Sequence, residues 1–175
     1  KEDCILLMKT ALDCLLLDGI WVEVGVFEGG TAELLYRVKD VNRKLYLFDT
    51  FEGLRKCQSP LDNPFVDGSW CGRENNVKAT FSTSTNLYIT KGWFPDCASE
   101  IKDLPICFAH LDTDIYESTK CCLEFIYPRL VEKGVIMIHD YLGSFVGINK
   151  AVDEFFEDKK ENPKRVGAFY GMITK

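Results

Sequence analysis

The feature that most constrains this fold is a set of apolar runs of strand length, separated by helical patterns. Each run is nearly continuous in Val, Ile, Leu and Phe, which is typical of strands buried on both faces of a sheet. The runs cover residues 20–26, 44–50, 86–92, 106–114 and 134–141. Helical patterns cover residues 31–40, 95–103, 117–131 and 147–160. This alternation predicts an α/β fold, with a mostly parallel, doubly wound sheet and helices on both faces.

The remaining segments are read less directly. Residues 4–17 have the pattern of an amphipathic helix, and residues 164–175 predict one more strand, or a short hairpin broken at Gly171. Residues 53–80 are polar and rich in Gly, Pro and Asn, yet they include Trp70. A loop of this length is usually functional or disordered, so we expect a lid or an insertion within one domain spanning residues 1–175.

Composition excludes several classes of function. The net charge is −6, whereas proteins that bind nucleic acids or anionic membranes need a basic face. No apolar stretch approaches the roughly 18 residues of a membrane-spanning helix. The eight cysteines are scattered and form no C-x-x-C pair, which favours free thiols in a reducing environment. We therefore expect a cytoplasmic protein that binds neither nucleic acid nor membrane.

Chargeable side chains follow four of the five predicted strands. The carboxyl ends of parallel strands meet at one edge of a sheet, where ligands bind in α/β proteins. After the first strand comes a glycine-rich loop. The later strands end in Asp49-Thr50-Phe51, Lys91-Gly92-Trp93, Asp112-Thr113-Asp114 and His139-Asp140-Tyr141. This edge is therefore the predicted active site.

The glycine-rich loop has the spacing G-x-x-x-G-G, not the G-x-G-x-x-G of dinucleotide-binding proteins. Its glycines allow close approach of the backbone to a ligand, and Thr31 is placed to cap the following helix. Asp49 follows Gly30 by the spacing at which an acidic residue meets ribose hydroxyls, although a turn or helix cap is an alternative role. Glu23 lies inside a predicted buried strand and needs a partner: a cationic ligand, or a nearby Lys or Arg.

Carboxylates at the ends of the fourth and fifth strands form the second candidate group. Asp112 and Asp140 would repel each other unless a cation bridges them, and a hard divalent ion suits such oxygen ligands. His139 is either part of this site or a histidine packed in the core. For Asp114 we expect a structural role, as the cap of the helix that begins at "YEST".

Together these residues resemble the macrocin O-methyltransferase (TylF-type) family of S-adenosylmethionine-dependent enzymes. The resemblance spans about residues 20 to 156, in family order. "FDTFEGL" and "LDTDIYEST" are its specific motifs, and the glycine loop alone indicates only class I methyltransferases. The other matching stretches are "VEVGVFEGGTAELL", "KGWFPD", "YPRLVEKGVIMIHDY" and "AVDEFF". The resemblance implies a Rossmann-like fold and methyl transfer from S-adenosylmethionine to a hydroxyl of a sugar or another small metabolite, with Mg²⁺ at the acceptor.

The resemblance also implies roles for individual residues. Those expected around the methionine part of the cofactor are Glu23, Gly25, Gly29, Gly30 and Thr31. Asp49 would hold the ribose hydroxyls with Thr50 and Phe51 alongside, Gly92 and Trp93 would lie near the adenine, and Asp112 would also border the cofactor. Asp112 and Asp140 would hold the metal, and Asp112 or His139 would accept the acceptor's proton.

This chain departs from the family pattern at His139, where a second aspartate is usual. A histidine nitrogen still binds a divalent ion, but it suits Mn²⁺, Zn²⁺ or Fe²⁺ better than Mg²⁺. The chain also looks shorter at its front than the family pattern, so we expect part of an acceptor pocket or of a homo-oligomer contact to be missing from it.

Two other functions fit parts of the sequence. Residues 112–114 match the D-x-D metal motif of nucleotide-sugar glycosyltransferases, although here the motif follows a glycine loop and a ribose-binding acid. A non-catalytic protein that retains the methyltransferase fold is the second alternative, because of His139 and the short front end.

Overall fold

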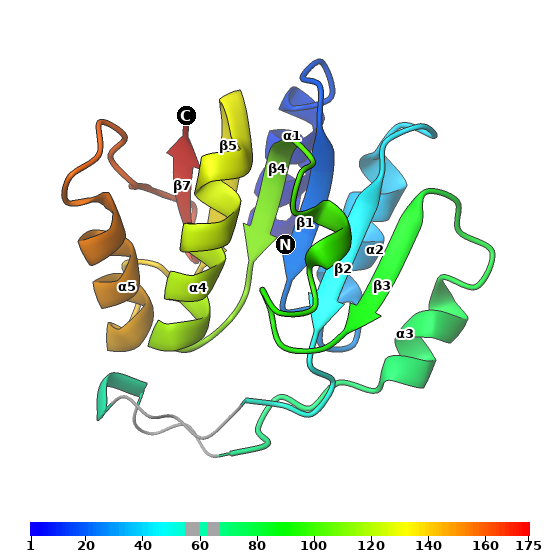
Figure 1. The fold of residues 1–175 in the computed structure, drawn as a ribbon, viewed down its shortest axis with the longest axis horizontal. Helices are drawn as coiled ribbons and strands as arrows, with labels where there is room; N and C mark the ends of the chain where they lie inside the picture. Colours follow the sequence, from blue (N-terminus) through cyan, green and yellow to red (C-terminus); the bar gives the residue numbers. More distant parts are fainter. Residues whose placement is uncertain (55–59, 63–66) are drawn as a thin grey trace.

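A computed structural model of the chain describes residues 1–54, 60–62 and 67–175. Its sheet has seven strands in the order β3-β2-β1-β4-β5-β7-β6 (Figure 1). The strands are β1 (Ile20–Val24), β2 (Leu45–Asp49), β3 (Leu87–Lys91), β4 (Ile106–Leu111), β5 (Leu130–His139), β6 (Lys164–Val166) and β7 (Tyr170–Thr174). The first five are mutually parallel, so the predicted α/β fold with a mostly parallel sheet is confirmed.

The strand order reverses direction between β1 and β4. From β1 the chain proceeds outward through β2 to β3, and it then returns to place β4 on the other side of β1. The crevice at the carboxyl ends of β1 and β4 is therefore a topological switch point, where open α/β sheets bind ligands. In Figure 1 these parallel strands end at the lower edge of the sheet.

Helices cover both faces of the sheet, as predicted. They are α1 (Glu2–Asp13), α2 (Gly30–Val38), α3 (Glu74–Thr80), α4 (Tyr116–Ile126) and α5 (Val146–Phe156). α4 and α5 lie in front of the sheet in Figure 1, and α1 and α2 lie behind it. Alternate residues of each strand feed two apolar cores: Val22 and Ala109 join the α4–α5 core, while Trp21 and Phe108 join the α1–α2 core. This is the burial on both faces that the continuous apolar runs predict.

Several predicted boundaries were wrong. Of the helix expected at 95–103, only the 3₁₀ turn η2 (Ser99–Ile101) forms. The helix expected to reach residue 131 ends at Ile126, and after the turn η3 (Tyr127–Arg129) β5 already begins at Leu130. α3 lies inside the segment that we expected to be a loop.

Residues 164–174 form a hairpin, but its turn is not at Gly171. β6 and β7 are antiparallel and pair through Val166 and Tyr170. Gly171 lies within β7, opposite Ile138 of β5, and β7 runs antiparallel to β5. A Cβ at this position would lie 2.3 Å from Cδ1 of the Tyr141 ring, so the glycine serves packing rather than a turn.

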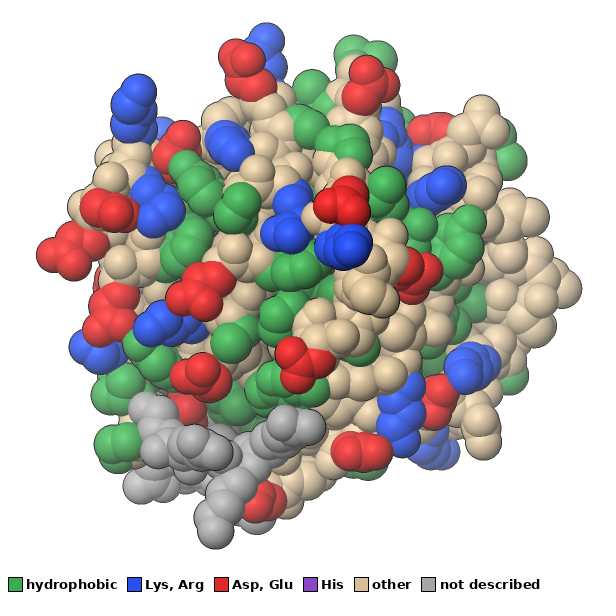
Figure 2. All heavy atoms as spheres, in the orientation of Figure 1, with side chains coloured by type: hydrophobic (Ala, Val, Ile, Leu, Met, Phe, Trp, Pro, Cys, Tyr) green, Lys and Arg blue, Asp and Glu red, His purple; other side chains and the backbone are tan. Residues whose placement is uncertain are grey.

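On the face shown in Figure 2, the acidic and basic side chains that are described are interspersed. None of the described helices is both long enough and apolar enough to cross a membrane. The cysteines within the described ranges are free thiols, as expected, and Cys57 lies outside those ranges.

Arg43, just before β2, forms hydrogen bonds with the segment that follows α1. Its side chain is only 10% exposed. The guanidinium donates hydrogen bonds to the carbonyls of Leu15 at 2.8 Å, Leu17 at 2.9 Å and Gly19. These carbonyls follow α1, where no further helical turn satisfies them.

We expect Arg43→Met to lower the free energy of unfolding by about 2–3 kcal/mol, because it leaves three partly buried carbonyls without their donor. Arg37→Met is the matched control, since the Arg37 side chain is 70% exposed and pairs with Glu33 of the same helix. It should change the free energy by less than about 0.5 kcal/mol. Urea unfolding measures both, and equal effects would show that Arg43 is not a structural tie.

Candidate active site

A cavity of about 520 Å³ opens at the carboxyl edge of the sheet, at the switch point between β1 and β4. Eight of the residues predicted for the site line it: Gly25, Asp49, Thr50, Gly92, Trp93, Asp112, His139 and Asp140. Five do not: Glu23, Gly29, Gly30, Thr31 and Phe51. The structure thus brings together the residues from all five strand ends, while part of the glycine loop lies behind the cavity wall.

Asp49 organises the glycine loop. Its Oδ2 accepts hydrogen bonds from the backbone N–H groups of Val26 at 2.7 Å and Phe27 at 2.8 Å. Its Oδ1 accepts one from Phe51 N–H at 2.7 Å. A carboxylate has about four acceptor sites, so Asp49 still has acceptor capacity toward the cavity. It therefore combines the predicted ligand-facing position with the turn-capping role that was its alternative.

Gly25 is where β1 and β4 come closest at the site. Its φ is +89°, and a Cβ there would lie 1.9 Å from the carbonyl oxygen of Asp112. The Asp112 N–H in turn donates to Val24 O at 2.9 Å. No side chain larger than hydrogen fits this contact, so the glycine fixes the distance between the loop and the Asp112 backbone.

Glu23 is fully buried on β1 and has partners within the protein. We expected a cationic ligand, a Lys or an Arg beside it. Instead, Glu23 Oε1 lies 2.9 Å from Nδ1 of His110, and it also accepts a hydrogen bond from the Thr31 hydroxyl. Thr31 therefore does not cap its own helix, which begins after Gly29 without a side-chain cap.

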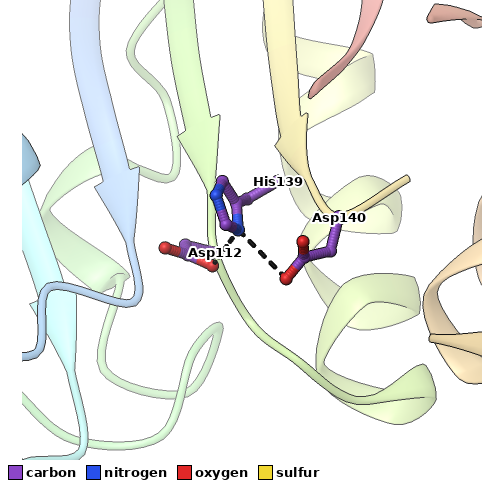
Figure 3. A group of neighbouring side chains, drawn as sticks. All are labelled: Asp112, His139 and Asp140. Carbon is purple, nitrogen blue, oxygen red and sulfur yellow. Dashed lines mark ion pairs between the residues drawn. The ribbon is translucent and has the colours of Figure 1, made fainter. Parts of the chain in front are cut away.

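His139 lies between Asp112 and Asp140 at the ends of β4 and β5 (Figure 3). Its Nδ1 is 3.2 Å from Asp112 Oδ1 and 3.1 Å from Asp140 Oδ2. Nδ1 is buried and has hydrogen-bond geometry with neither oxygen. Rings of Phe169 and Tyr170 hold the imidazole, with centroids at 5.9 Å and 5.2 Å. His139 therefore belongs to the site and is not a histidine packed away in the core.

The charges in this group shift one another's pKa values. Burial acts to raise the pKa of the Asp112 carboxyl, but contact with His139 and the charges of His110 and His139 hold it below its usual range. Burial acts to lower the pKa of His139, yet its contacts with Asp112 and Asp140 raise that pKa to about 10. Burial and the charges of Asp112 and Asp140 raise the pKa of Asp114 to about 7. The site thus concentrates negative charge that favours a cation.

The same three side chains fit a divalent metal ion. One donor atom from each of Asp112, His139 and Asp140 lies within 4.8 Å of the others. Metal–ligand distances of about 2.1–2.2 Å put neighbouring ligands of an octahedral ion about 3.0–3.1 Å apart. The two N···O distances, 3.1 Å and 3.2 Å, match that spacing. Two carboxylates and one imidazole are a donor set for Mn²⁺ and its neighbours as well as for Mg²⁺.

Asp114 does not cap the helix that follows it. α4 begins after Ile115 without a cap from its own flanking residues, and Asp114, at φ +60°, lines the cavity. The cap comes from Asp62, whose Oδ1 accepts a hydrogen bond from Tyr116 N–H at 2.8 Å. Asp62 lies in the short 3₁₀ helix η1 (Pro60–Asp62) and is only 2% exposed. Its distance in sequence from α4 is why sequence reasoning missed it.

Asp62 predicts a pH dependence of stability. Burial raises the pKa of its carboxyl above 3.8, with the charge of Glu117 adding to this and the Tyr116 N–H opposing it. The folded state then holds this proton more tightly than the unfolded state, so its contribution to stability decreases as pH rises from about 4 through the raised pKa. Relative to Asp62→Asn, the wild type should lose stability over that interval in urea unfolding; a constant difference would contradict this.

Aromatic side chains form much of the cavity's remaining wall, and most were missed. They are Phe27, Phe48, Trp70, Phe94, Phe145 and Phe169. The rings of Trp70 and Phe27 meet edge to face at 6.0 Å. Trp70 had been singled out as an apolar residue in a polar segment, and it lines the cavity together with Gly53 and Leu54. Phe65, the other aromatic of that segment, lies outside the described residues.

The two curated proteins compared below are both O-methyltransferases. A methyltransferase from Streptomyces olivaceus, acting at the 4'-O position of a dimethoxyrhamnosyl-tetracenomycin, is 29% identical over 154 residues, covering 77% of this chain and 58% of that protein. Demethyldecarbamoylnovobiocin O-methyltransferase from Streptomyces niveus is 27% identical over 156 residues, covering 78% and 58%. The chain thus spans less than two thirds of the length of these relatives.

Solved structures share the fold. The O-methyltransferase NovP superposes with a TM-score of 0.88 at 21% identity, over 99% of this chain and 79% of NovP. The calicheamicin methyltransferase CalS11 gives a TM-score of 0.81 at 17% identity, over 98% and 77%. The profile of the macrocin-O-methyltransferase (TylF) family matches residues 8–164. The resemblance to this family is therefore confirmed: the chain belongs to the macrocin-O-methyltransferase (TylF) family.

Proposed function

We propose that this chain methylates a hydroxyl of a sugar or another small metabolite, using S-adenosylmethionine. The observation that carries the proposal is one cavity that joins the Gly25 loop, Asp49 and the Asp112–His139–Asp140 group in a chain of this family. The rhamnosyl group named in one relative supports a sugar hydroxyl as acceptor.

The lining of the cavity suggests how the cofactor lies. Gly25 offers exposed backbone to the methionine part, and Asp49 offers carboxylate oxygen to the ribose hydroxyls, with Thr50 beside it. Gly92 and Trp93 offer a wall for the adenine. Gly29, Thr31 and Phe51 shape the loop and the turn after β2 without lining the cavity, while Gly30 only begins α2. Glu23 is fully buried, so we assign it no direct contact with the cofactor.

At the acceptor end, Asp112, His139 and Asp140 would hold a divalent metal, with Mg²⁺ or Mn²⁺ as candidates. When bound, the cofactor supplies an activated methyl group, and the metal supplies positive charge that lowers the pKa of the acceptor hydroxyl. The pKa of His139 is raised to about 10, so without a metal its ring is already protonated at neutral pH. In the metal-free site, Asp112 is therefore the better proton acceptor of the two residues that we considered.

The protein's main contribution is alignment. Displacement at the methyl carbon needs the acceptor oxygen in line with the bond that breaks, and holding two reactants in this geometry accounts for much of the rate. The rings of Phe145 and Phe169 line the cavity together with His139, and Asp112 would receive the proton from an acceptor hydroxyl held within hydrogen-bond reach.

Turnover against a panel of hydroxylated acceptors, with and without EDTA, tests the proposal. We expect methyl transfer to at least one glycosylated acceptor, and loss of turnover on chelation that added Mg²⁺ or Mn²⁺ restores. Transfer that EDTA leaves unchanged would remove the metal from the proposal. Absence of transfer to any acceptor, together with failure to bind S-adenosylhomocysteine, would contradict the enzymatic function itself.

A further inference from the structure

Behind the glycine loop lies a buried polar cluster formed by Glu23, His110 and Thr31. Glu23 and His110 are opposite each other on β1 and β4, and both are 0% exposed. Glu23 Oε1 is 2.9 Å from His110 Nδ1 and also accepts the hydrogen bond of the Thr31 hydroxyl.

Packing does not explain this cluster. The surrounding core is apolar and includes Trp21, Phe108 and Met137. Within the described part of the chain, Glu23 Oε2 and His110 Nε2 have no hydrogen-bond partner. A buried, incompletely satisfied polar pair is in general no more stabilising than two apolar side chains of similar volume. A role other than stability is therefore the better account.

The cluster joins three elements that lie around the site: β1, α2 and β4. β1 leads into Gly25, α2 begins where the glycine loop ends, and β4 leads into Asp112. α2 has no side-chain cap, and the hydroxyl of Thr31 in its first turn bonds to Glu23 instead. Glu23 thus connects the start of α2 and, through His110, the strand that carries Asp112.

We propose that Glu23 and His110 are positioning residues, which act through Thr31 and the backbone to hold the cofactor loop in register with Asp112. They touch neither the cofactor nor the acceptor. This inference rests on the proposed function, because the loop is taken to be the cofactor loop. It explains why the first acidic residue of the chain's glycine motif is buried out of reach of a ligand.

The double variant Glu23→Leu/His110→Leu separates positioning from stability. We expect its unfolding midpoint in urea to equal or exceed that of the wild type, while its affinity for S-adenosylhomocysteine falls about tenfold. Hydrogen exchange, followed by mass spectrometry without ligand, should speed up in residues 25–33. An affinity within twofold of wild type and unchanged exchange would overturn the proposal.

Thr31 provides the matched pair of single variants. Thr31→Val removes the hydroxyl with little change of shape and should weaken S-adenosylhomocysteine binding severalfold. Thr31→Ser retains the hydroxyl and should bind S-adenosylhomocysteine with the affinity of the wild type. In the Glu23→Leu/His110→Leu background, Thr31→Val should add no further loss, because its partner is gone. Additive losses would contradict action through Glu23.

The hydrogen-exchange measurement also separates failure of the proposed function from failure of the positioning role of Glu23 and His110. If the wild type does not bind S-adenosylhomocysteine, the proposed function fails, but the cluster is still judged by the exchange of residues 25–33. If the wild type binds and neither the affinity nor the exchange of the variants changes, the positioning role fails and the proposed function stands.

Discussion

Asp112→Asn should lower kcat for methyl transfer by about 10³-fold, because it removes the proposed proton acceptor and one ligand of the proposed metal. Binding of S-adenosylhomocysteine should change by less than about threefold, since the substitution is isosteric and leaves the Asp112 N–H bond to Val24 in place. Initial rates with saturating cofactor, together with calorimetry, measure the two quantities.

Asp103→Asn is the control for that variant. The Asp103 side chain is 84% exposed and distant from the cavity lining, so the same chemical change should leave kcat unaltered. A kcat for Asp112→Asn within tenfold of the wild type would show that Asp112 neither takes the proton nor holds an essential metal.

Gly25→Ala should abolish detectable cofactor binding, with an expected loss of at least about 100-fold in affinity for S-adenosylhomocysteine. The added methyl would stand 1.9 Å from the carbonyl oxygen of Asp112, in a backbone conformation that disfavours side chains. β1 and β4 must then separate at the site, and we expect about 2–4 kcal/mol of lost stability.

Gly30→Ala introduces the same methyl group a few residues away. Gly30 is the first residue of α2, and apart from its chain neighbours and the helix backbone no atom of the described residues lies within 4 Å of a Cβ there. We expect unchanged affinity and a stability equal to wild type or higher by up to about 1 kcal/mol, as for other Gly to Ala changes in helices. If both variants behaved alike, the close contact at Gly25 would not be the cause.

Much of the site could be predicted because strand ends are readable in sequence. A buried parallel strand is a continuous apolar run, and the first chargeable residue after it lies at the ligand-binding edge. This placed Asp49, Asp112, His139 and Asp140 around one cavity before their distances were known.

The predicted ends of helices and strands were wrong where packing, rather than local composition, determines the structure. α3 has the sequence ENNVKAT, whose Asn and Thr are weak helix formers, yet Val77 is fully buried and Lys78 pairs with Glu74. The first residues of β5 include exposed Glu132 and Lys133, which have no strand signature. Val77 joins a core cluster with Leu35 and Leu47, and the Lys133 N–H donates to the Lys175 carbonyl, so contacts distant in sequence add stabilisation that local composition does not reveal.

Contacts between side chains that are distant in sequence were also not predicted. His110 lies in an apolar run and gave no sign that it would face Glu23, 87 residues earlier. Asp62 lies in a polar segment and gave no sign that it would cap α4, 54 residues later. Strand register and helix placement create these pairs, and neither can be read from local pattern.

The most direct test of the central claim is titration calorimetry of the purified chain with S-adenosylhomocysteine and, separately, with UDP-sugars in the presence of Mn²⁺. The account predicts saturable binding of about one S-adenosylhomocysteine per chain, lost in Gly25→Ala and kept in Gly30→Ala, and no binding of UDP-sugars. Saturable binding of a UDP-sugar without binding of S-adenosylhomocysteine would contradict it and would identify residues 112–114 as the metal motif of a glycosyltransferase.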